Sequence, residues 1–112
     1  MYKIDSNNNI TIVRGDYLSL TLELFDEEGE PYTPQMGDSI RFAVAEEWGI
    51  TKKTDCLIFK NIDTSNMIIE ITGADTKKLG FGTYKYDIEF TDAYGHSDTI
   101  IKGEFIVDTE VY

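Results

Sequence analysis

Residues 82–90 read GTYKYDIEF, and this stretch shows the pattern that decides the fold. Its apolar residues occupy every second position from Tyr84 to Phe90, and each position between them carries a charge. In an extended strand such residues point alternately to opposite faces, so one face is apolar and the other polar. The stretch therefore predicts a strand that covers a hydrophobic core with one face and meets water with the other.

The same period of two recurs along most of the chain. Alternating or short apolar runs predict seven strands, at residues 10–13, 18–24, 40–44, 57–59, 67–71, 84–90 and 101–107. Two D-x-x-G turns, Asp26–Gly29 and Asp92–Gly95, follow the second and sixth of these strands. Aspartate caps the first corner of such a turn, and glycine accepts the left-handed backbone. Residues 46–55 are expected to form a long loop.

One short stretch has helical signals. Thr72 to Asp75 matches the start of a capping box, and Leu79-Gly80 is typical of a helix end. We expect one or two helical turns here, between the fifth and sixth strands. No repeat or linker divides the chain, so residues 1–112 are interpreted as one domain, with the polar residues 1–9 as a loose N-terminal arm.

Seven short strands without β–α–β alternation predict an all-β protein built from two packed antiparallel sheets, a β-sandwich. The place of Tyr84 favours the immunoglobulin-like arrangement, in which a corner tyrosine near the start of the sixth strand bonds back to upstream backbone. Tyr86 then takes the inward position that antibody domains give to a cysteine. Because Cys56 is the only cysteine, no internal disulfide can form. The predicted core residues are Tyr86, Leu22, Phe42 and Phe90.

The charge balance excludes several classes of partner. The 112 residues include 21 acidic and 10 basic ones, which gives a net charge of −11. Affinity for phosphate depends on lysine and arginine, so we predict neither a nucleic-acid partner nor an anionic membrane partner. No apolar run reaches membrane-spanning length, and the first residues lack the apolar stretch of a signal peptide.

The chain shows no grouping typical of an enzyme. His96, the only histidine, follows the turn glycine Gly95, and Cys56 stands about forty residues away at the edge of a predicted strand. No nucleophile elbow, phosphate-binding glycine loop or pair of zinc ligands occurs. We therefore predict a non-enzymatic protein without a cofactor.

Carboxylates gather at both turns: Asp26, Glu27, Glu28 and Glu30 at the first, and Asp92 and Asp98 at the second. Calcium needs six to eight oxygen ligands, and no EF-hand spacing is present. If the second and sixth strands end at opposite poles, the two clusters cannot share an ion. We therefore predict no metal site.

Two further features bear on adhesion. Arg14-Gly15-Asp16 spells an integrin-recognition tripeptide, but it lies between two predicted strands, where Gly15 most simply permits a tight connection. Three aromatic residues fall in predicted loops, where they could form a carbohydrate-binding platform: Tyr32, Trp48 and Tyr94. The alternative for Trp48 is that it folds back against the edge of the sandwich.

Three isoleucines have the phase of an outer face. Ile100 and Ile106 alternate with the inward residues of the last strand, and Ile68 stands beside the inward Ile69. Outward isoleucines either occur singly without a role or form a patch that a partner covers. Ile68, Ile100 and Ile106 are therefore our candidate interface residues.

Several short motifs appear in a familiar order: IVRGD at 12–16, DEEGEPY at 26–32, TGADT at 72–76, GTYKYDI at 82–88 and IIKGEFIV at 100–107. Together, over about residues 10–108, they resemble the immunoglobulin-like N-terminal domain of the baseplate upper protein family of tailed phages and prophages of Gram-positive bacteria. In that family a long stalk and further regions follow the domain, whereas this sequence stops just after its last strand. We therefore expect either a stand-alone accessory protein or a fragment.

The resemblance implies a structural protein of the virion, made in the bacterial cytoplasm. Its role would be that of a tail, baseplate or fibre attachment module that contacts other virion proteins or copies of itself. The family offers no active-site residues to carry over. The alternative function is a carbohydrate-binding or cell-surface adhesion module.

Overall fold

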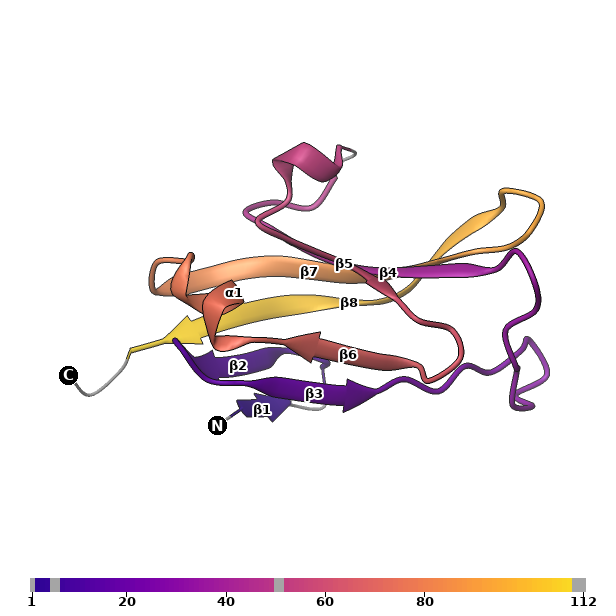
Figure 1. Ribbon diagram of the computed structural model, residues 1–112, viewed down its shortest axis with the longest axis horizontal. Helices are drawn as coiled ribbons and strands as arrows, with labels where there is room; N and C mark the ends of the chain where they lie inside the picture. Colours follow the sequence, from indigo (N-terminus) through magenta and orange to yellow (C-terminus); the bar gives the residue numbers. More distant parts are fainter. Residues whose placement is uncertain (1, 5–6, 50–51, 110–112) are drawn as a thin grey trace.

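The computed structural model describes the backbone of residues 2–4 and the whole of residues 7–49 and 52–109 (Figure 1). Along the chain, the elements are β1 (Tyr2–Ile4), β2 (Ile10–Val13), β3 (Leu18–Thr21), β4 (Ser39–Ala45), the 3-10 helix η1 (Lys53–Asp55), β5 (Ile58–Ile62), β6 (Ile68–Ile71), α1 (Gly73–Lys77), β7 (Gly82–Thr91) and β8 (Ser97–Asp108). The prediction of an all-β protein is confirmed, and each of the seven predicted stretches carries a strand.

The strands form two sheets that lie in separate layers (Figure 1). The larger sheet has the order β1-β2-β8-β7-β4-β5, and the smaller one pairs β3 with β6. The prediction of purely antiparallel sheets is wrong for one pair, because β2 runs parallel to β8, with Ile10 opposite Phe105. Parallel neighbours need a long connection, and here almost the whole chain separates the two strands.

The predicted loose N-terminal arm is also wrong in part. Residues 2–4 form β1, which pairs antiparallel with β2 and places Tyr2 opposite Ile12. The polar composition of this segment did not predict a strand. Its backbone nevertheless pairs with β2, which lies about eight residues further along the chain. β1 extends the larger sheet by one strand beyond β2.

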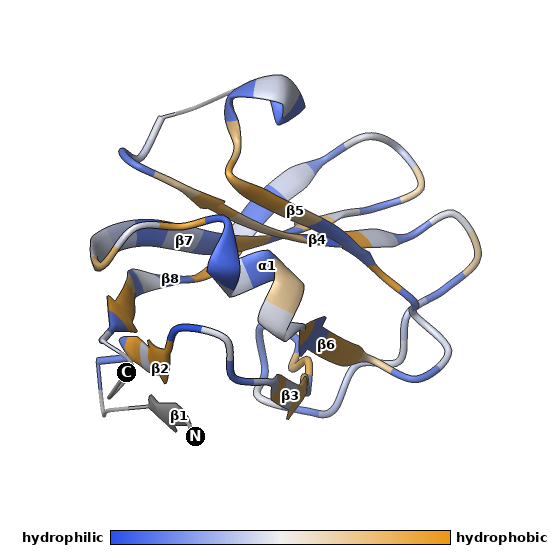
Figure 2. Cartoon of the chain, turned by 60° about the vertical axis from the view of Figure 1, so that its left-hand side comes forward, coloured by the Kyte–Doolittle hydropathy of each residue, from blue (hydrophilic) through white to orange (hydrophobic). Residues whose placement is uncertain are grey.

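The hydrophobic core lies between the two sheets. Phe42 of β4 and Phe105 of β8 are fully buried, and Leu18 and Ile71 meet them from the smaller sheet. Figure 2 shows hydrophobic residues concentrated on the strands, while the connections are mostly hydrophilic. Of the predicted core residues, Leu22, Phe42 and Tyr86 are buried as expected. Phe90 is only partly buried, because it lies near the end of β7, beyond the centre of the core.

The corner tyrosine is present. The Tyr84 hydroxyl donates to the Gly80 carbonyl oxygen over 2.8 Å, which ties the start of β7 to the chain before it. The Tyr86 side chain points into the core, with its ring centroid 5.5 Å from that of Phe42, and its hydroxyl donates to the Asn8 carbonyl at 2.5 Å. Gly103 permits this crossing, since a Cβ there would lie 2.6 Å from the Asn8 carbonyl oxygen.

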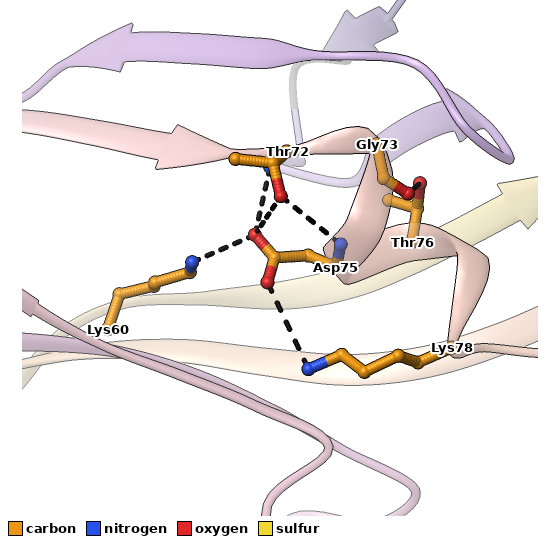
Figure 3. A network of polar contacts seen from close by, with 6 residues as sticks. All are labelled: Lys60, Thr72, Gly73, Asp75, Thr76 and Lys78. Carbon is orange, nitrogen blue, oxygen red and sulfur yellow. Dashed lines mark hydrogen bonds and ion pairs between the residues drawn. The ribbon is translucent and has the colours of Figure 1, made fainter.

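The predicted capping box opens α1 (Figure 3). The Asp75 N–H donates to Thr72 Oγ1 at 3.2 Å, and the Thr72 N–H donates to Asp75 Oδ2 at 2.9 Å. Lys60 reaches over from β5 and places its Nζ 2.8 Å from the same carboxylate. Burial alone would raise the pKa of Asp75, but the hydrogen bonds from Lys60 and Thr72 outweigh it and lower that pKa. The helix is therefore fastened to the edge of the larger sheet.

Both predicted D-x-x-G turns have the expected geometry. Asp26 Oδ1 accepts hydrogen bonds from the N–H groups of Glu28 and Glu30, at 3.0 and 2.9 Å. Asp92 Oδ1 does the same for the residues two and four positions further on, at 2.9 Å each. Gly29 and Gly95 have φ angles of +80° and +86°, the left-handed region that glycine tolerates best.

Candidate binding surfaces

One end of the molecule combines the long β3–β4 connection with the β7–β8 turn (Figure 1). The two segments touch: a Cβ at Gly37 would lie 2.7 Å from the Ala93 Cβ. Tyr32 is held at the base of this end, because its hydroxyl donates to Asp38 Oδ2 at 2.6 Å and its ring meets Phe90 edge to face. That hydrogen bond raises the pKa of Tyr32. A groove of about 430 Å³ runs between the segments.

We call this end the acidic pole. It comprises the groove-lining residues Leu24, Phe25, Asp26, Glu27, Glu28, Tyr32, Phe90, Asp92, Asp98 and Ile100, together with the neighbouring Met36 and Tyr94. The two carboxylate clusters thus share one pole, so the condition under which they could not share an ion, strands ending at opposite poles, is not met. The chain leaves β3 and β7 in the same direction, and this orientation is a property of the topology that sequence spacing does not encode.

Two carboxylates of the acidic pole, those of Asp26 and Asp92, are occupied by turn contacts. In the described part of the chain, no group of three or more His, Cys, Asp or Glu side chains is placed to hold a metal ion. Asp92 instead accepts hydrogen bonds within its own turn. The largest effect on its pKa comes from the His96 N–H. This bond, with those from the Tyr94 N–H and the His96 ring, lowers the pKa of Asp92 although desolvation would raise it. Glu27 and Glu28 are exposed and have no cationic partner within ion-pair distance among the described residues.

Large apolar side chains gather at the same pole. The exposed fractions are 59% for Phe25, 98% for Met36, 88% for Tyr94 and 37% for Ile100. These are four of the seven large hydrophobic residues that are exposed in the described chain. Exposed large apolar residues usually occur singly, so their concentration within one groove and its rim makes this a candidate contact surface.

A second surface lies on the outer face of the larger sheet, where the β4–β5 loop folds back over it. Trp48 of this loop lies over two lysines of the sheet, with the Lys85 Nζ 4.9 Å and the Lys102 Nζ 4.7 Å from its ring centroid. Trp48 therefore covers the outer face, and the alternative that it plugs the edge of the sandwich is wrong. A hollow of about 240 Å³ remains beside it, lined by apolar groups from Ala43, Ala45 and Phe59.

We call this surface the basic cradle, defined by Arg41, Trp48, Lys52, Lys53, Lys85 and Lys102. It holds five of the ten basic residues of the chain. Five nearby carboxylates, Glu47, Asp55, Asp87, Glu89 and Glu104, balance these five charges in a chain of net charge −11. The basic cradle is therefore nearly neutral overall, whereas the acidic pole is negative.

The cations of the basic cradle fall into two groups. Two are paired: the Arg41 guanidinium lies 2.5 Å from Asp87 Oδ1 and 3.3 Å from Glu89 Oε2, and the Lys85 Nζ lies 3.5 Å from Glu104 Oε1. Burial would lower the pKa of Arg41, but the carboxylates of Asp87 and Glu89 outweigh it and raise that pKa. Lys52, Lys53 and Lys102 have no carboxylate within 4.0 Å among the described residues, so their charge is available to a partner.

The single cysteine and the single histidine belong to different surfaces. Cys56 lines the hollow of the basic cradle, where burial raises the pKa of its thiol and so disfavours the nucleophilic thiolate. His96 lies at the acidic pole, with its Nδ1 3.1 Å from Asp92 Oδ2. The structure thus does not bring these two side chains together.

The three candidate interface isoleucines do not form one patch. Ile68 lies on the outer face of the smaller sheet, opposite Thr21, and Ile106 on the outer face of the larger one, opposite Thr83. The outward phase predicted for Ile100 is wrong, because β8 is irregular opposite Ile88 and Glu89 and contains one extra residue there. Ile100 consequently lines the groove of the acidic pole beside Phe90, on the core side of the sheet.

The three loop aromatics are likewise divided. Tyr32 and Tyr94 lie at the acidic pole and Trp48 at the basic cradle, so they form no common platform. The integrin-like tripeptide packs against α1: the Arg14 guanidinium donates to the carbonyls of Leu79 and Lys77, at 3.0 and 2.6 Å. Gly15, with φ at +93°, makes the tight connection that was predicted.

Sequence reasoning missed Phe25 and Met36 at the acidic pole and the three available lysines of the basic cradle. Lys52-Lys53 beside Trp48 is a signal that could have been noticed, but its proximity to Lys102 depends on the sheet register. No family model matches the chain, and no curated protein was found that resembles it significantly. Among the described residues, no helix has the length and hydrophobicity needed to cross a bilayer.

Proposed function

We propose that the two sheets form a β-sandwich of the immunoglobulin type. The order β8-β7-β4 in the larger sheet, with β3 paired to β6 opposite, matches the C–F–G and B–E pairings of that fold. The hydrogen bond from Tyr84 to Gly80 matches its corner tyrosine. Tyr86 then stands where antibody domains have a disulfide cysteine, and its ring packs on Phe42 of β4, the neighbouring strand of the same sheet.

We further propose that the protein is a non-enzymatic structural protein of a phage or prophage virion, which attaches one tail, baseplate or fibre component to another. The observation that carries a binding role is the concentration of exposed apolar side chains at the acidic pole. Burying a side chain such as that of Phe25 against a partner contributes about 1.5–3 kcal/mol. Aromatic anchors within a polar rim are the usual composition of a protein contact. The virion as the setting rests on the motif resemblance.

The test uses particles purified from the phage or lysogen that encodes the chain. The protein should sediment with the particles in a density gradient and be detected there by antibody. Phe25→Ser combined with Tyr94→Ser should abolish incorporation. Tyr17→Ser combined with Phe81→Ser removes similar exposed aromatic surface away from the acidic pole and serves as the matched control. Finding the wild-type protein only in the free fraction would refute the virion role.

A carbohydrate-binding or adhesion role is the second candidate, favoured by the half-exposed ring of Trp48 beside a hollow. Sugars commonly stack on such rings, and the flanking lysines would favour acidic ones. Binding on a glycan array that is lost in Trp48→Ala, but kept in Phe25→Ser, would support this function over the first. An array without binding would reject it.

A further inference from the structure

The acidic pole and the basic cradle have matching compositions. Each has an apolar centre, formed by Phe25 and Ile100 in the first and by Trp48 and Phe59 in the second. Each also has charged groups around this centre that lack an ion-pair partner among the described residues: carboxylates at the acidic pole and lysines at the basic cradle. Complementary rims around apolar centres are what specific protein contacts show, because the charges fix the orientation and the apolar groups supply affinity.

The available charges also match. Glu27 and Glu28 at the acidic pole lack a cationic partner, and Lys52 and Lys53 at the basic cradle lack an anionic one, among the described residues. A contact between the two surfaces would pair groups that the isolated chain leaves solvated. Since the basic cradle lies on the outer face of the larger sheet and the acidic pole at one of its ends, two molecules can supply one surface each (Figure 1).

We propose that the acidic pole of one copy of this chain docks into the basic cradle of a second copy. This inference rests on the proposed structural role and names the partner for it. The contact uses different surfaces on the two molecules, so every copy keeps one free surface of each kind. Such heterologous contacts continue into a closed ring or an open filament.

The net charge of −11 opposes association of identical copies, and this repulsion acts over long distances. At about 0.15 M salt the screening length is about 8 Å, so repulsion between distant charges is largely removed while contacts across the docked surfaces persist. Association should therefore be weaker at low ionic strength than at physiological ionic strength. A purely electrostatic contact between oppositely charged proteins would show the reverse.

The decisive experiment is a charge exchange measured by light scattering over a concentration series. The weight-average mass of the wild type should rise with concentration. Lys52→Glu with Lys53→Glu, or Glu27→Lys with Glu28→Lys, should each weaken association at least about tenfold, since several close charge pairs become repulsive. An equimolar mixture of the two variants should regain it, because each reversed surface then faces a complementary one.

The control is Glu70→Lys with Asp108→Lys, which makes the same change in net charge as the variant of the acidic pole, but on exposed residues elsewhere. It should associate at least as well as the wild type. Recovery in the mixture also proves that both variants are folded, and thermal melting checks each one alone. A wild type that stays monomeric, or a mixture that fails to associate, would overturn the proposal.

The outcome separates this proposal from the virion role. A protein that is incorporated into particles but never self-associates would contradict the self-docking alone. A protein that self-associates by charge exchange but is absent from particles would contradict the virion role alone. Binding of an acidic glycan at the basic cradle, without any change in mass, would also count against self-docking.

Discussion

The two ends of the molecule differ in whether their surface groups have partners within the chain. At the α1 end, polar groups meet partners. Asp75 joins the helix start to Lys60 (Figure 3), and the Arg14 guanidinium donates to carbonyls at the helix end. An exposed aromatic ring there, Phe81, has the Arg14 guanidinium 5.8 Å from its centroid. At the acidic pole, Phe25 and Tyr94 face solvent within a rim of carboxylates. The polar groups of the first end are paired within the chain, whereas the second end exposes large apolar side chains to solvent.

The largest effect on stability is expected at the α1 end from Gly73→Ala. A Cβ at this position would lie 2.4 Å from the Gly15 carbonyl oxygen, so α1 or the β2–β3 connection must move. We expect a loss of about 2–3 kcal/mol in the free energy of unfolding, measured by denaturant titration. Gly80→Ala is the matched control, because its nearest contact would be an ordinary 3.8 Å to the Tyr84 hydroxyl. Equal stability of the two variants would contradict this reading.

A smaller loss is expected from Asp75→Ala, which removes the reciprocal cap of α1 and leaves Lys60 without its carboxylate. The free energy of unfolding should fall by about 1–2 kcal/mol at neutral pH. Glu70→Ala, on an exposed carboxylate of β6, should change it little. If both substitutions have the same small effect, Asp75 does not anchor the helix.

The contribution of Asp75 should depend on pH in a defined direction. Its pKa is lowered in the folded protein, so the stabilisation is fully present above the unfolded value of about 3.9 and is lost as the pH falls through the folded pKa. The difference in stability between wild type and Asp75→Ala should therefore be constant near neutral pH and shrink below about pH 4. A difference that grows on acidification would exclude the lowered pKa.

The smallest effect on folding is expected at the acidic pole. Phe25→Ser with Tyr94→Ser removes exposed groups that pack little within the chain, so the free energy of unfolding should change by no more than about 0.5 kcal/mol. The same pair should abolish incorporation into particles. Calorimetry measures the free energy of unfolding of this variant, which can then be compared with the losses expected at the α1 end. A large loss of stability would show that the rings support the fold.

Local features of the fold were predictable from the sequence, and distant ones were not. The strand from Tyr84 to Phe90, the capping box at Thr72 and the turn at Asp92 depend on residues a few positions apart, so their signals lie within short windows. The parallel pairing of β2 with β8 joins residues about 95 positions apart, as in Ile10 opposite Phe105. No short window contains that information.

The two candidate surfaces could not be predicted from the sequence for the same reason. The acidic pole brings Asp26 and Asp98 to one groove, and the basic cradle brings Trp48 to Lys102, through connections that the topology alone determines. Ile100 was assigned to the wrong face because counting by two assumes a regular strand. The extra residue in β8 breaks that count between Ile101 and Thr99.

That irregularity has a consequence for how this domain can change. A one-residue shift in the register of a regular strand moves every one of its side chains to the opposite face of the sheet, so that the core residues become exposed. Here the extra residue absorbs such a shift between the buried half of β8 and its tip. Insertions or deletions in residues 97–100 would therefore change which side chains are exposed at the tip of the β7–β8 hairpin, while Phe105 and Val107 remain in the core. A change in the length of this hairpin would therefore alter its tip and leave the core beneath it unchanged.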